Sequence, residues 1–196
     1  MADQFTPTEH SQLWDRFRTG SPGAFSQLYR SFAADLYSYG YRLVRHKELV
    51  EDCLHELFLH IHENRSRLGY TDNIRYYLCR ALRRRLAESV ERLNRLESSP
   101  CLLDRPAFLT HSYESLLIDE QVVAHQQRVL ETAMNRLPKR QKEILHLVYL
   151  QGLTYPQAAE VMNLSMKSVY NTVHVALKTL RGQVKPYSKH QAFFGF

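Results

Sequence analysis

The sequence predicts an all-α protein made of two small helical domains. Apolar residues recur at three- and four-residue steps along most of its length, and no segment shows the sustained two-residue alternation of a half-buried strand. The helical pattern is interrupted between Glu97 and about Leu117, where two prolines stand among small polar residues. The last third contains two short helical patterns joined by a tight turn. We therefore expect domains over residues 11–96 and 118–185, joined by a linker over 97–117.

The composition is that of a globular protein. Apolar residues make up 44% of the 196 residues, and Lys and Arg outnumber Asp and Glu by 26 to 20. This basic balance, with an isoelectric point near 9.3, favours a polyanionic partner without requiring one. No apolar run is long enough for membrane insertion, and the N-terminus lacks signal-peptide features, so we expect a cytoplasmic location. The cysteines share no metal or redox spacing and are expected to be reduced; they are Cys53, Cys79 and Cys101.

Four helices are expected in the first domain. A short helix over 11–18 should end at Gly20, and Ser21 should cap a second helix with Pro22 in its first turn. A third is expected over about 47–65 and a fourth over about 72–96, with Asp72 as its cap. The apolar side of the second helix carries Phe25, Leu28, Tyr29, Phe32, Leu36 and Leu43.

The second domain is expected to contain helices over 118–136, 139–151, 155–162 and 166–181, with Gly152 and Gly182 as C-terminal stops. Thr154 and Ser165 should cap the last two helices, and Asn163 should adopt the left-handed conformation in the turn between them. Small Ala159 would allow these helices to approach closely. A buried stripe on the last helix is predicted from Val169, Val173, Ala176, Leu177 and Leu180.

These last two helices form a helix-turn-helix pattern, whose second helix can enter the DNA major groove. The buried stripe leaves a polar face with Lys167, Ser168, Tyr170, Asn171, His174 and Lys178. Asn can read adenine with two hydrogen bonds, Lys can reach guanine or phosphate, and Tyr can donate to phosphate. An ordinary pair of short helices with a solvated polar face is the alternative that this pattern leaves open.

Together with its upstream flank, LPKRQKEI (137–144) and YLQGLTY (149–155), this segment resembles region 4 of bacterial sigma factors of the sigma-70 family. The first domain resembles region 2 of the same family in AFSQLYR (24–30), VEDCLHELFL (50–59) and NIRYYLCR (73–80). Two signatures in the family's order are more specific than either alone. The resemblance is greatest to the extracytoplasmic-function (ECF) group.

The resemblance implies that the third helix docks on a coiled coil of the polymerase β′ subunit. An exposed aromatic side chain beside acids would suit such a surface. The alternative is that the aromatic residue belongs to the core and the acids are solvated. At one position where the family usually has Gln, this chain has His55. The polymerase-binding residues implied are Asp52, His55, Glu56, Phe58 and Leu59.

The resemblance also implies that the fourth helix and the loop before it grip the −10 promoter element. Its surplus of arginines can neutralise phosphates, and tyrosines can stack on unpaired bases at about 1 to 3 kcal/mol per base. Tyrosines buried in a helix bundle are the alternative. Arg84 and Glu88 replace the Asn and Asp common in relatives, so backbone contacts are expected without base preference. The residues implied are Tyr70, Asn73, Arg75, Tyr76, Arg80, Arg83 and Arg84.

No catalytic constellation, cofactor motif or metal site is expected. His55 and His60 lie five positions apart, roughly 140° around a helix, so they cannot share one zinc ion. No phosphate-binding loop or nucleophile elbow is present in the sequence. We therefore expect a binding protein and not an enzyme.

The leading hypothesis is a sigma factor that binds the β′ and β subunits of core RNA polymerase, recognises −35 duplex DNA and helps melt the −10 element of promoter DNA. An anti-sigma factor is a further partner that the family allows. One alternative is a dimeric helix-turn-helix regulator that is not a polymerase subunit. Another is a helical adaptor that binds only protein and has no salt-dependent affinity for DNA.

Overall fold

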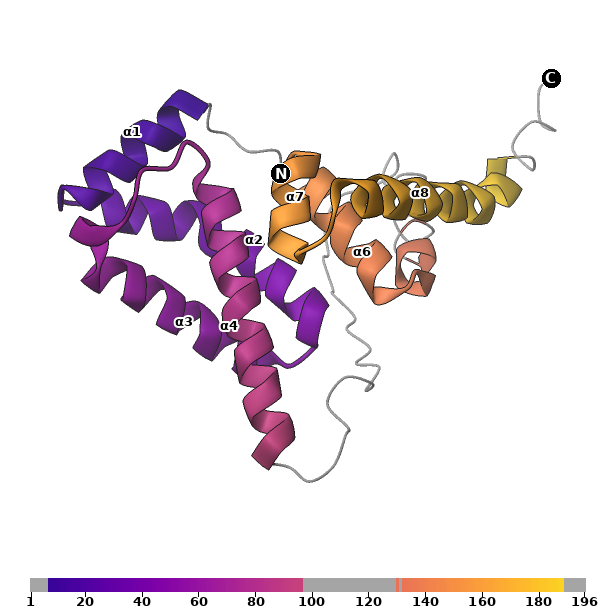
Figure 1. Cartoon of the computed structure of the whole chain (residues 1–196), viewed down its shortest axis with the longest axis horizontal. Coiled ribbons are helices and arrows are strands. Elements are labelled where there is room, and N and C mark those ends of the chain that lie inside the picture. The colour runs from indigo at the N-terminus through magenta and orange to yellow at the C-terminus, as the bar shows by residue number, and fades with distance from the viewer. Residues whose placement is uncertain (1–6, 97–129, 131, 189–196) are drawn as a thin grey trace, which may run out of the picture.

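The computed structural model describes residues 7–96, 130 and 132–188, and these ranges contain helices and turns without a strand (Figure 1). The predicted all-α class is confirmed. Four predicted features lie outside the described residues: the linker over 97–117, Cys101, the helix expected from 118 except for its end at 132–136, and the C-terminal tail from 189. The elements are α1 (Pro7–Arg18), α2 (Ala24–Val44), α3 (Lys47–Glu63), η1 (Arg65–Arg67), α4 (Ile74–Leu96), α6 (Lys139–Leu145), η2 (His146–Leu150), α7 (Tyr155–Met162) and α8 (Met166–Ser188).

The first four helices pack around one apolar core, which each helix enters with side chains at three- and four-residue steps. At Gly40, α2 lies so close to α3 and α4 that there is no room for a side chain. A Cβ atom there would lie 2.9 Å from Val50 Cγ1 and 3.3 Å from Leu86 Cδ1. A side chain at this position would force α2 away from α3 and α4. The largest fully buried side chains are Trp14, Phe17, Leu28, Phe32, Leu36, Tyr39, Leu57, Ile61, Ile74, Leu78, Leu82 and Leu86.

Several helix boundaries differ from the expected ones. The start of α2 is Gly23, with φ of 80°, and not Ser21. The cap of α4 is Asn73, whose Oδ1 accepts a hydrogen bond from the Tyr76 amide at 2.9 Å, and not Asp72. Gly182 does not end α8, which continues to Ser188, because glycine inside a helix costs only about 1 kcal/mol.

The second group of helices packs against the first. α4 contacts α2 and α3 on one side and α7 on the other, and α6 contacts α2 (Figure 1). The buried side chains of both groups form one continuous cluster. Cys53 and Cys79 are buried within it as free thiols. Over the described ranges, no helix combines the length and apolar character needed to cross a bilayer.

Candidate nucleic-acid interface

The turn between α7 and α8 has the geometry that the sequence predicted. Thr154 Oγ1 accepts from the Gln157 amide, and the Gln157 side chain accepts from the Thr154 amide at 3.0 Å, which completes a capping box. Asn163 adopts the left-handed conformation with φ of 54° and ψ of 51°. Ser165 Oγ then accepts from the Ser168 amide at 3.2 Å and caps α8. Three local interactions therefore fix the angle between the two helices.

α8 buries one face and exposes the other. Val169, Val173 and Ala176 are buried against α6 and α7, while Leu177 and Leu180 are partly buried. The exposed side carries Lys167, Tyr170, Asn171, His174 and Lys178, as expected, whereas Ser168 is half-buried. The Tyr170 ring packs edge-on against Tyr155 at 5.0 Å, which holds it beside the start of the helix. This face offers donors and acceptors along more than two turns.

Two residues implied for the −10 element lie on the open surface of the first domain. Tyr70 is 66% exposed, and its hydroxyl shares a hydrogen bond with Ser11 Oγ at 2.8 Å. The Arg84 side chain is 74% exposed and pairs only loosely with Glu88, at 3.6 Å. Both are accessible to a nucleic-acid strand. Tyr77, in contrast, is half-buried against Trp14 at a ring distance of 5.1 Å.

Four other −10 candidates contact the second domain. Asn73 Nδ2 donates to Gln157 Oε1 at 3.4 Å, and Arg83 Nε donates to Glu143 Oε1 at 2.6 Å. Arg80 Nη1 donates to Glu160 at 3.2 Å. The Tyr76 hydroxyl hydrogen-bonds to the same Glu160 carboxylate and accepts from Arg80 at 3.0 Å. The side of α4 expected to face DNA therefore faces α6 and α7 in this arrangement.

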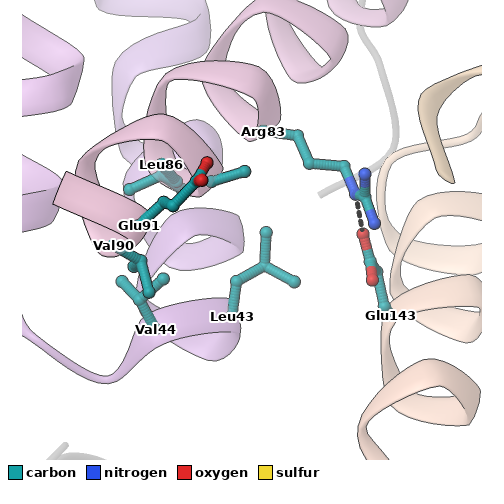
Figure 2. Close-up of a pocket in the computed structure, with 8 residues that line it drawn as sticks. Leu43, Val44, Arg83, Leu86, Val90, Glu91 and Glu143 are labelled. Atoms are coloured by element: carbon teal, nitrogen blue, oxygen red, sulfur yellow. Dashed lines mark hydrogen bonds and ion pairs between the residues drawn. The ribbon is translucent and has the colours of Figure 1, made fainter. Parts of the chain in front are cut away.

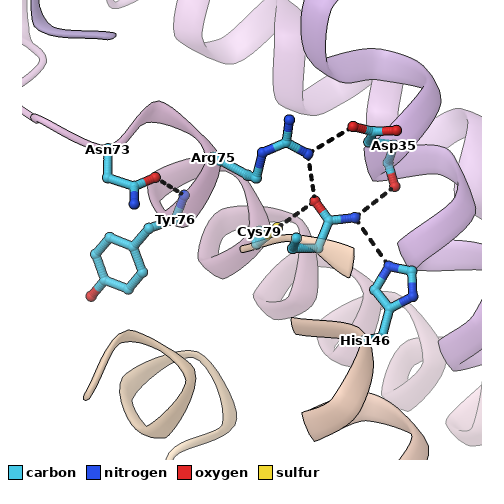
Figure 3. A network of polar contacts seen from close by, with 7 residues as sticks. Asp35, Asn73, Arg75, Tyr76, Cys79 and His146 are labelled. Carbon is cyan, nitrogen blue, oxygen red and sulfur yellow. Dashed lines mark hydrogen bonds and ion pairs between the residues drawn. The ribbon is translucent and has the colours of Figure 1, made fainter. Parts of the chain in front are cut away.

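Arg75 is the expected DNA contact that the structure places in the interior. It is only 5% exposed, and its guanidinium lies over the Phe32 ring at 5.4 Å. Its Nη1 donates to Asp35 Oδ2 at 2.7 Å and to Gln151 Oε1 at 3.0 Å (Figure 3). A phosphate cannot reach Arg75 without displacing the second domain. Its role here is to join α2 and α4 to the end of η2.

Gln151 and His146 were missed by the sequence analysis. Five positions apart, they would point roughly 140° from each other on an α-helix. The π-helical turn η2 brings them to one side, where Gln151 Nε2 lies 3.0 Å from His146 Nε2 and also donates to the Asp35 carbonyl at 3.3 Å (Figure 3). Both side chains are buried. The π turn, which sequence periodicity does not reveal, is what makes this contact.

Burial keeps His146 neutral. The pKa of its imidazole falls to about 4, first because burial disfavours the charged form and then because Arg42 is close, with Asp35 opposing the change. The ring also stacks on Tyr39 at 5.5 Å. Because the Gln151 amide can only donate to Nε2, the proton of the neutral ring belongs on Nδ1. Nδ1 finds no hydrogen-bond partner among the described residues.

An apolar pocket of about 360 Å³ lies beside the Arg83–Glu143 pair, between the end of α2 and α4 (Figure 2). Glu143 also accepts from the Tyr39 hydroxyl at 3.3 Å, and its side chain is only 9% exposed. Burial raises the Tyr39 pKa well above its usual value, and the Glu143 charge adds to this effect. The remaining lining residues are Leu43, Val44, Leu86, Ala87, Val90 and Glu91.

The expected polymerase-binding surface is only partly as predicted. Phe58 is 2% exposed, so the expectation of an exposed aromatic side chain at this position is wrong. Its ring packs under Tyr29 at 4.8 Å and beside Phe25 at 6.3 Å, which removes it from solvent. Tyr29, 46% exposed, is the aromatic residue presented there. The remaining expected residues are exposed on α3: Asp52, His55, Glu56 and Leu59.

Comparison with known families identifies both domains. The sigma-70 region 2 family matches residues 28–96, and the sigma-70 region 4 family matches residues 127–180. The two matches follow the family's order and together span more than half of the chain. The chain belongs to the sigma-70 family. This agrees with the resemblance to regions 2 and 4 that the sequence shows. Sigma factors initiate transcription and are not catalysts themselves.

Two solved structures show the same fold. The sigma factor RpoE from Bartonella quintana, solved in complex with the anti-sigma factor NepR, is 17% identical with a TM-score of 0.63. The alignment covers 83% of this sigma factor and 98% of that chain. CnrH, solved in complex with the cytosolic domain of CnrY, is also 17% identical, with a TM-score of 0.59 over 90% and 97% of the two chains. Among curated proteins, none matches this sigma factor significantly.

Proposed function

We propose that this sigma factor binds core RNA polymerase and directs it to promoters by recognising −35 duplex DNA and helping to melt the −10 element. The observation that carries the proposal is the exposed polar face of α8, presented at a capped and sharply turned helix-turn-helix inside a region 4 match. Such a helix reads base edges with the side chains near its N-terminus. Asn171 suits base reading, and Lys178 suits a phosphate.

The −10 element is proposed to meet α4 and the loop before it. Exposed Tyr70 can stack on an unpaired base, and exposed Arg84 can neutralise a phosphate. Asn73, Tyr76, Arg80 and Arg83 lie on an adjoining part of the same helix, and they are proposed to join this surface. Because arginines dominate, contacts to the backbone should exceed base-specific contacts.

The exposed side of α3 is proposed to bind the β′ subunit of the polymerase. The second domain is proposed to bind the β subunit. Asp52, His55 and Leu59 are exposed on α3, and Tyr29 is exposed where its ring packs on Phe58, so both polar and apolar groups are available to a partner. Glu56 is also exposed, although it pairs with Arg85 of α4 at 3.6 Å. Phe58 supports this surface from below and does not contact the partner.

An anti-sigma factor is proposed as a further partner. The support is the fold shared with RpoE of Bartonella quintana, which was solved with NepR, together with CnrH, which was solved with the cytosolic domain of CnrY. A partner that covers the exposed side of α3 would compete with polymerase for that surface. Co-purification of this sigma factor with an inhibitor encoded in its host, released by core polymerase, would test this part.

The central experiment mixes the purified protein with core RNA polymerase and maps transcription starts on genomic DNA of its host. New starts that share upstream sequences at −35 and −10 are expected. A dimeric regulator would instead bind a two-fold symmetric site without polymerase. A protein-only adaptor would show no salt-dependent DNA affinity, whereas each phosphate contact adds about −0.9 to the log–log salt slope. Either result, or starts unchanged from core enzyme alone, would contradict the proposal.

A further inference from the structure

Two exposed apolar side chains border the polar face of α8. Val175 is 46% exposed and Tyr170 is 55% exposed. They lie five positions apart, roughly 140° around the helix, and Asn171 lies between them on the same face. Asn171 and Val175 are also four positions apart, so their side chains are neighbours on the helix surface. The face proposed to meet DNA is therefore apolar at both edges, although Val175 was not among the residues expected there.

The Tyr170 ring is already held in place in the free protein. It packs edge-on against Tyr155, with 5.0 Å between the ring centroids. Tyr155 is the first residue of α7 and follows the Thr154 cap, so this contact joins the first turn of α7 to α8. A tyrosine side chain has few rotatable bonds, and the contact restricts them further. Little conformational entropy is therefore lost when the ring meets a base.

Two hydroxyl groups near the start of α8 are engaged within the helix. Ser165 Oγ, which caps the helix, donates to Ser168 Oγ at 3.2 Å. The Thr172 hydroxyl donates to the Ser168 carbonyl at 2.7 Å. Ser168 and Thr172 are also half-buried, so they are poorly placed to read a base.

The same face has few groups that read guanine. Guanine is read most often by a bidentate arginine or lysine, and no arginine occurs between residues 166 and 180. The exposed lysines, Lys167 and Lys178, stand at the two ends of the face. Between them lie Asn171, His174 and the two apolar side chains. The centre of the face is thus suited to adenine and to apolar groups on the bases.

We propose that Val175 and Tyr170 contact the C5-methyl groups of thymines, and that the centre of the −35 site is therefore rich in A·T pairs. This inference rests on the proposed function, because it concerns the α8 face proposed to read the −35 element. Thymine carries a methyl group in the major groove, where apolar side chains recognise it, while Asn171 reads an adenine. Side chains four positions apart are about 6 Å apart, close to two base steps of about 3.4 Å. A thymine is therefore expected within two base pairs of that adenine.

A selection experiment with the holoenzyme determines the base composition of the site. The full-length sigma factor, bound to core polymerase, is mixed with a duplex promoter library randomised over the −35 region. We expect the enriched sequences to carry adjacent A·T pairs at the centre of this region. Enrichment of sequences with G·C pairs there would overturn the inference and leave the proposed function intact. Absence of any enriched sequence would contradict the proposed function, and the inference with it.

Replacing single thymines of the selected site by deoxyuridine tests the methyl contact, because only the C5-methyl group is removed. At the thymine read by Val175, the replacement should weaken binding of the holoenzyme about three- to fourfold, as expected for one buried methyl group. In Val175→Ala, the same replacement should change the affinity much less. An equal loss in wild type and Val175→Ala, or no loss at any thymine, would overturn the assignment of Val175.

Met166→Ala is the matched control for Val175→Ala. Met166 is another exposed apolar residue of α8, at 37%, but it lies nine positions from Val175, roughly 180° around the helix. The Met166→Ala protein should keep the wild-type response to deoxyuridine at every position. If this variant lost the response as Val175→Ala does, the assignment to Val175 would be wrong.

Tyr170 is tested by removing its hydroxyl and its ring separately. Tyr170→Phe keeps the ring and should retain the response to deoxyuridine at a second thymine, whereas Tyr170→Ala should remove it. Tyr155→Ala, which frees the Tyr170 ring, should reduce this response and leave the response at the Val175 thymine unchanged. Loss of the response in Tyr170→Phe would show that the hydroxyl makes the contact, which would overturn the assignment of the Tyr170 ring.

Discussion

Arg75 of α4 donates a hydrogen bond to the side-chain oxygen of Gln151 across 3.0 Å, although 76 positions separate the two residues in the sequence. The Gln151 amide nitrogen in turn donates to the Asp35 carbonyl and lies against His146 Nε2. One glutamine therefore uses its acceptor and both donors to join α2, α4 and η2. Because buried polar groups are costly when unpaired, this arrangement gives the interface between the domains a defined register.

Gln151→Ala should destabilise the protein. The change would leave a buried arginine donor and the Asp35 carbonyl short of a partner, at a cost of about 2 to 3 kcal/mol. Chemical denaturation at pH 7 measures the change in the free energy of unfolding. Glu88→Gln, on the exposed side of α4, is the control and should stay within about 0.5 kcal/mol. A Gln151→Ala protein as stable as this control would show that the network contributes nothing net.

The free energy of unfolding should decrease as the pH is lowered below 6.5, partly because of His146. The folded-state pKa of about 4 lies below the unfolded value of about 6.5, so the unfolded chain binds the proton first as the pH falls. Neutral His146 therefore makes its full contribution to the free energy of unfolding above pH 6.5. This contribution, about 3 kcal/mol in total, is lost as the pH falls towards 4. Arg42 and Asp35, the charged neighbours that act on this ring, oppose each other.

His146→Gln isolates this term from the titration of carboxylates elsewhere. The difference between the unfolding free energies of wild type and variant should change with pH between 4 and 6.5 and be constant above pH 7. A constant difference over the whole range would show that His146 does not titrate between these two values.

Gly40→Ala should lower stability by about 1 to 3 kcal/mol, because the added Cβ would lie only 2.9 Å from Val50 Cγ1 and 3.3 Å from Leu86 Cδ1. Gly182→Ala is the matched control. It lies within α8 with nothing within 4 Å of its Cβ position, so it should be neutral or stabilising by up to about 1 kcal/mol. Thermal unfolding compares the two, and equal shifts would contradict the packing argument.

Asn171→Ala should relax discrimination at one −35 position by about 1 to 3 kcal/mol, because a base-reading amide is lost. Lys178→Ala should weaken binding to all sequences alike and reduce the salt slope by about 1. Affinities of the reconstituted holoenzyme for a set of single-base promoter variants measure both effects. If the two changes lowered affinity identically on every variant, the assignment of base reading to Asn171 would be wrong.

Leu59→Ala should weaken the complex with core polymerase by about 1 to 2 kcal/mol, because Leu59 is 47% exposed on the proposed docking surface. The stability of the free protein should change little. Phe58→Ala, one position earlier, should instead cost about 3 to 5 kcal/mol of stability, since its ring is buried. Polymerase titrations and unfolding curves distinguish the two. Equal polymerase affinity for wild type and Leu59→Ala would remove Leu59 from the interface.

Features that depend on a few neighbouring residues follow directly from the amino-acid sequence. Helical periodicity predicted the all-α class, and local side-chain chemistry predicted the Thr154 cap, the left-handed Asn163 and the Ser165 cap. The polar face of α8 followed from the same periodicity, with only Ser168 less exposed than expected. Each of these depends on contacts within about four positions, which a pattern in the sequence records directly.

Which polar and aromatic side chains are buried depends on how distant segments pack together. Phe58 and Arg75 sit at positions where helical spacing allows either burial or exposure, and their fate depends on Tyr29 and on Gln151 from distant segments. The π turn that joins His146 to Gln151 breaks the regular spacing from which faces are predicted. The cover that Glu143 and Glu160 place over α4 arises only when the two domains pack. Periodicity identifies the side of a helix that needs a partner, but the partner is chosen by the shape and charge of a surface formed elsewhere in the chain.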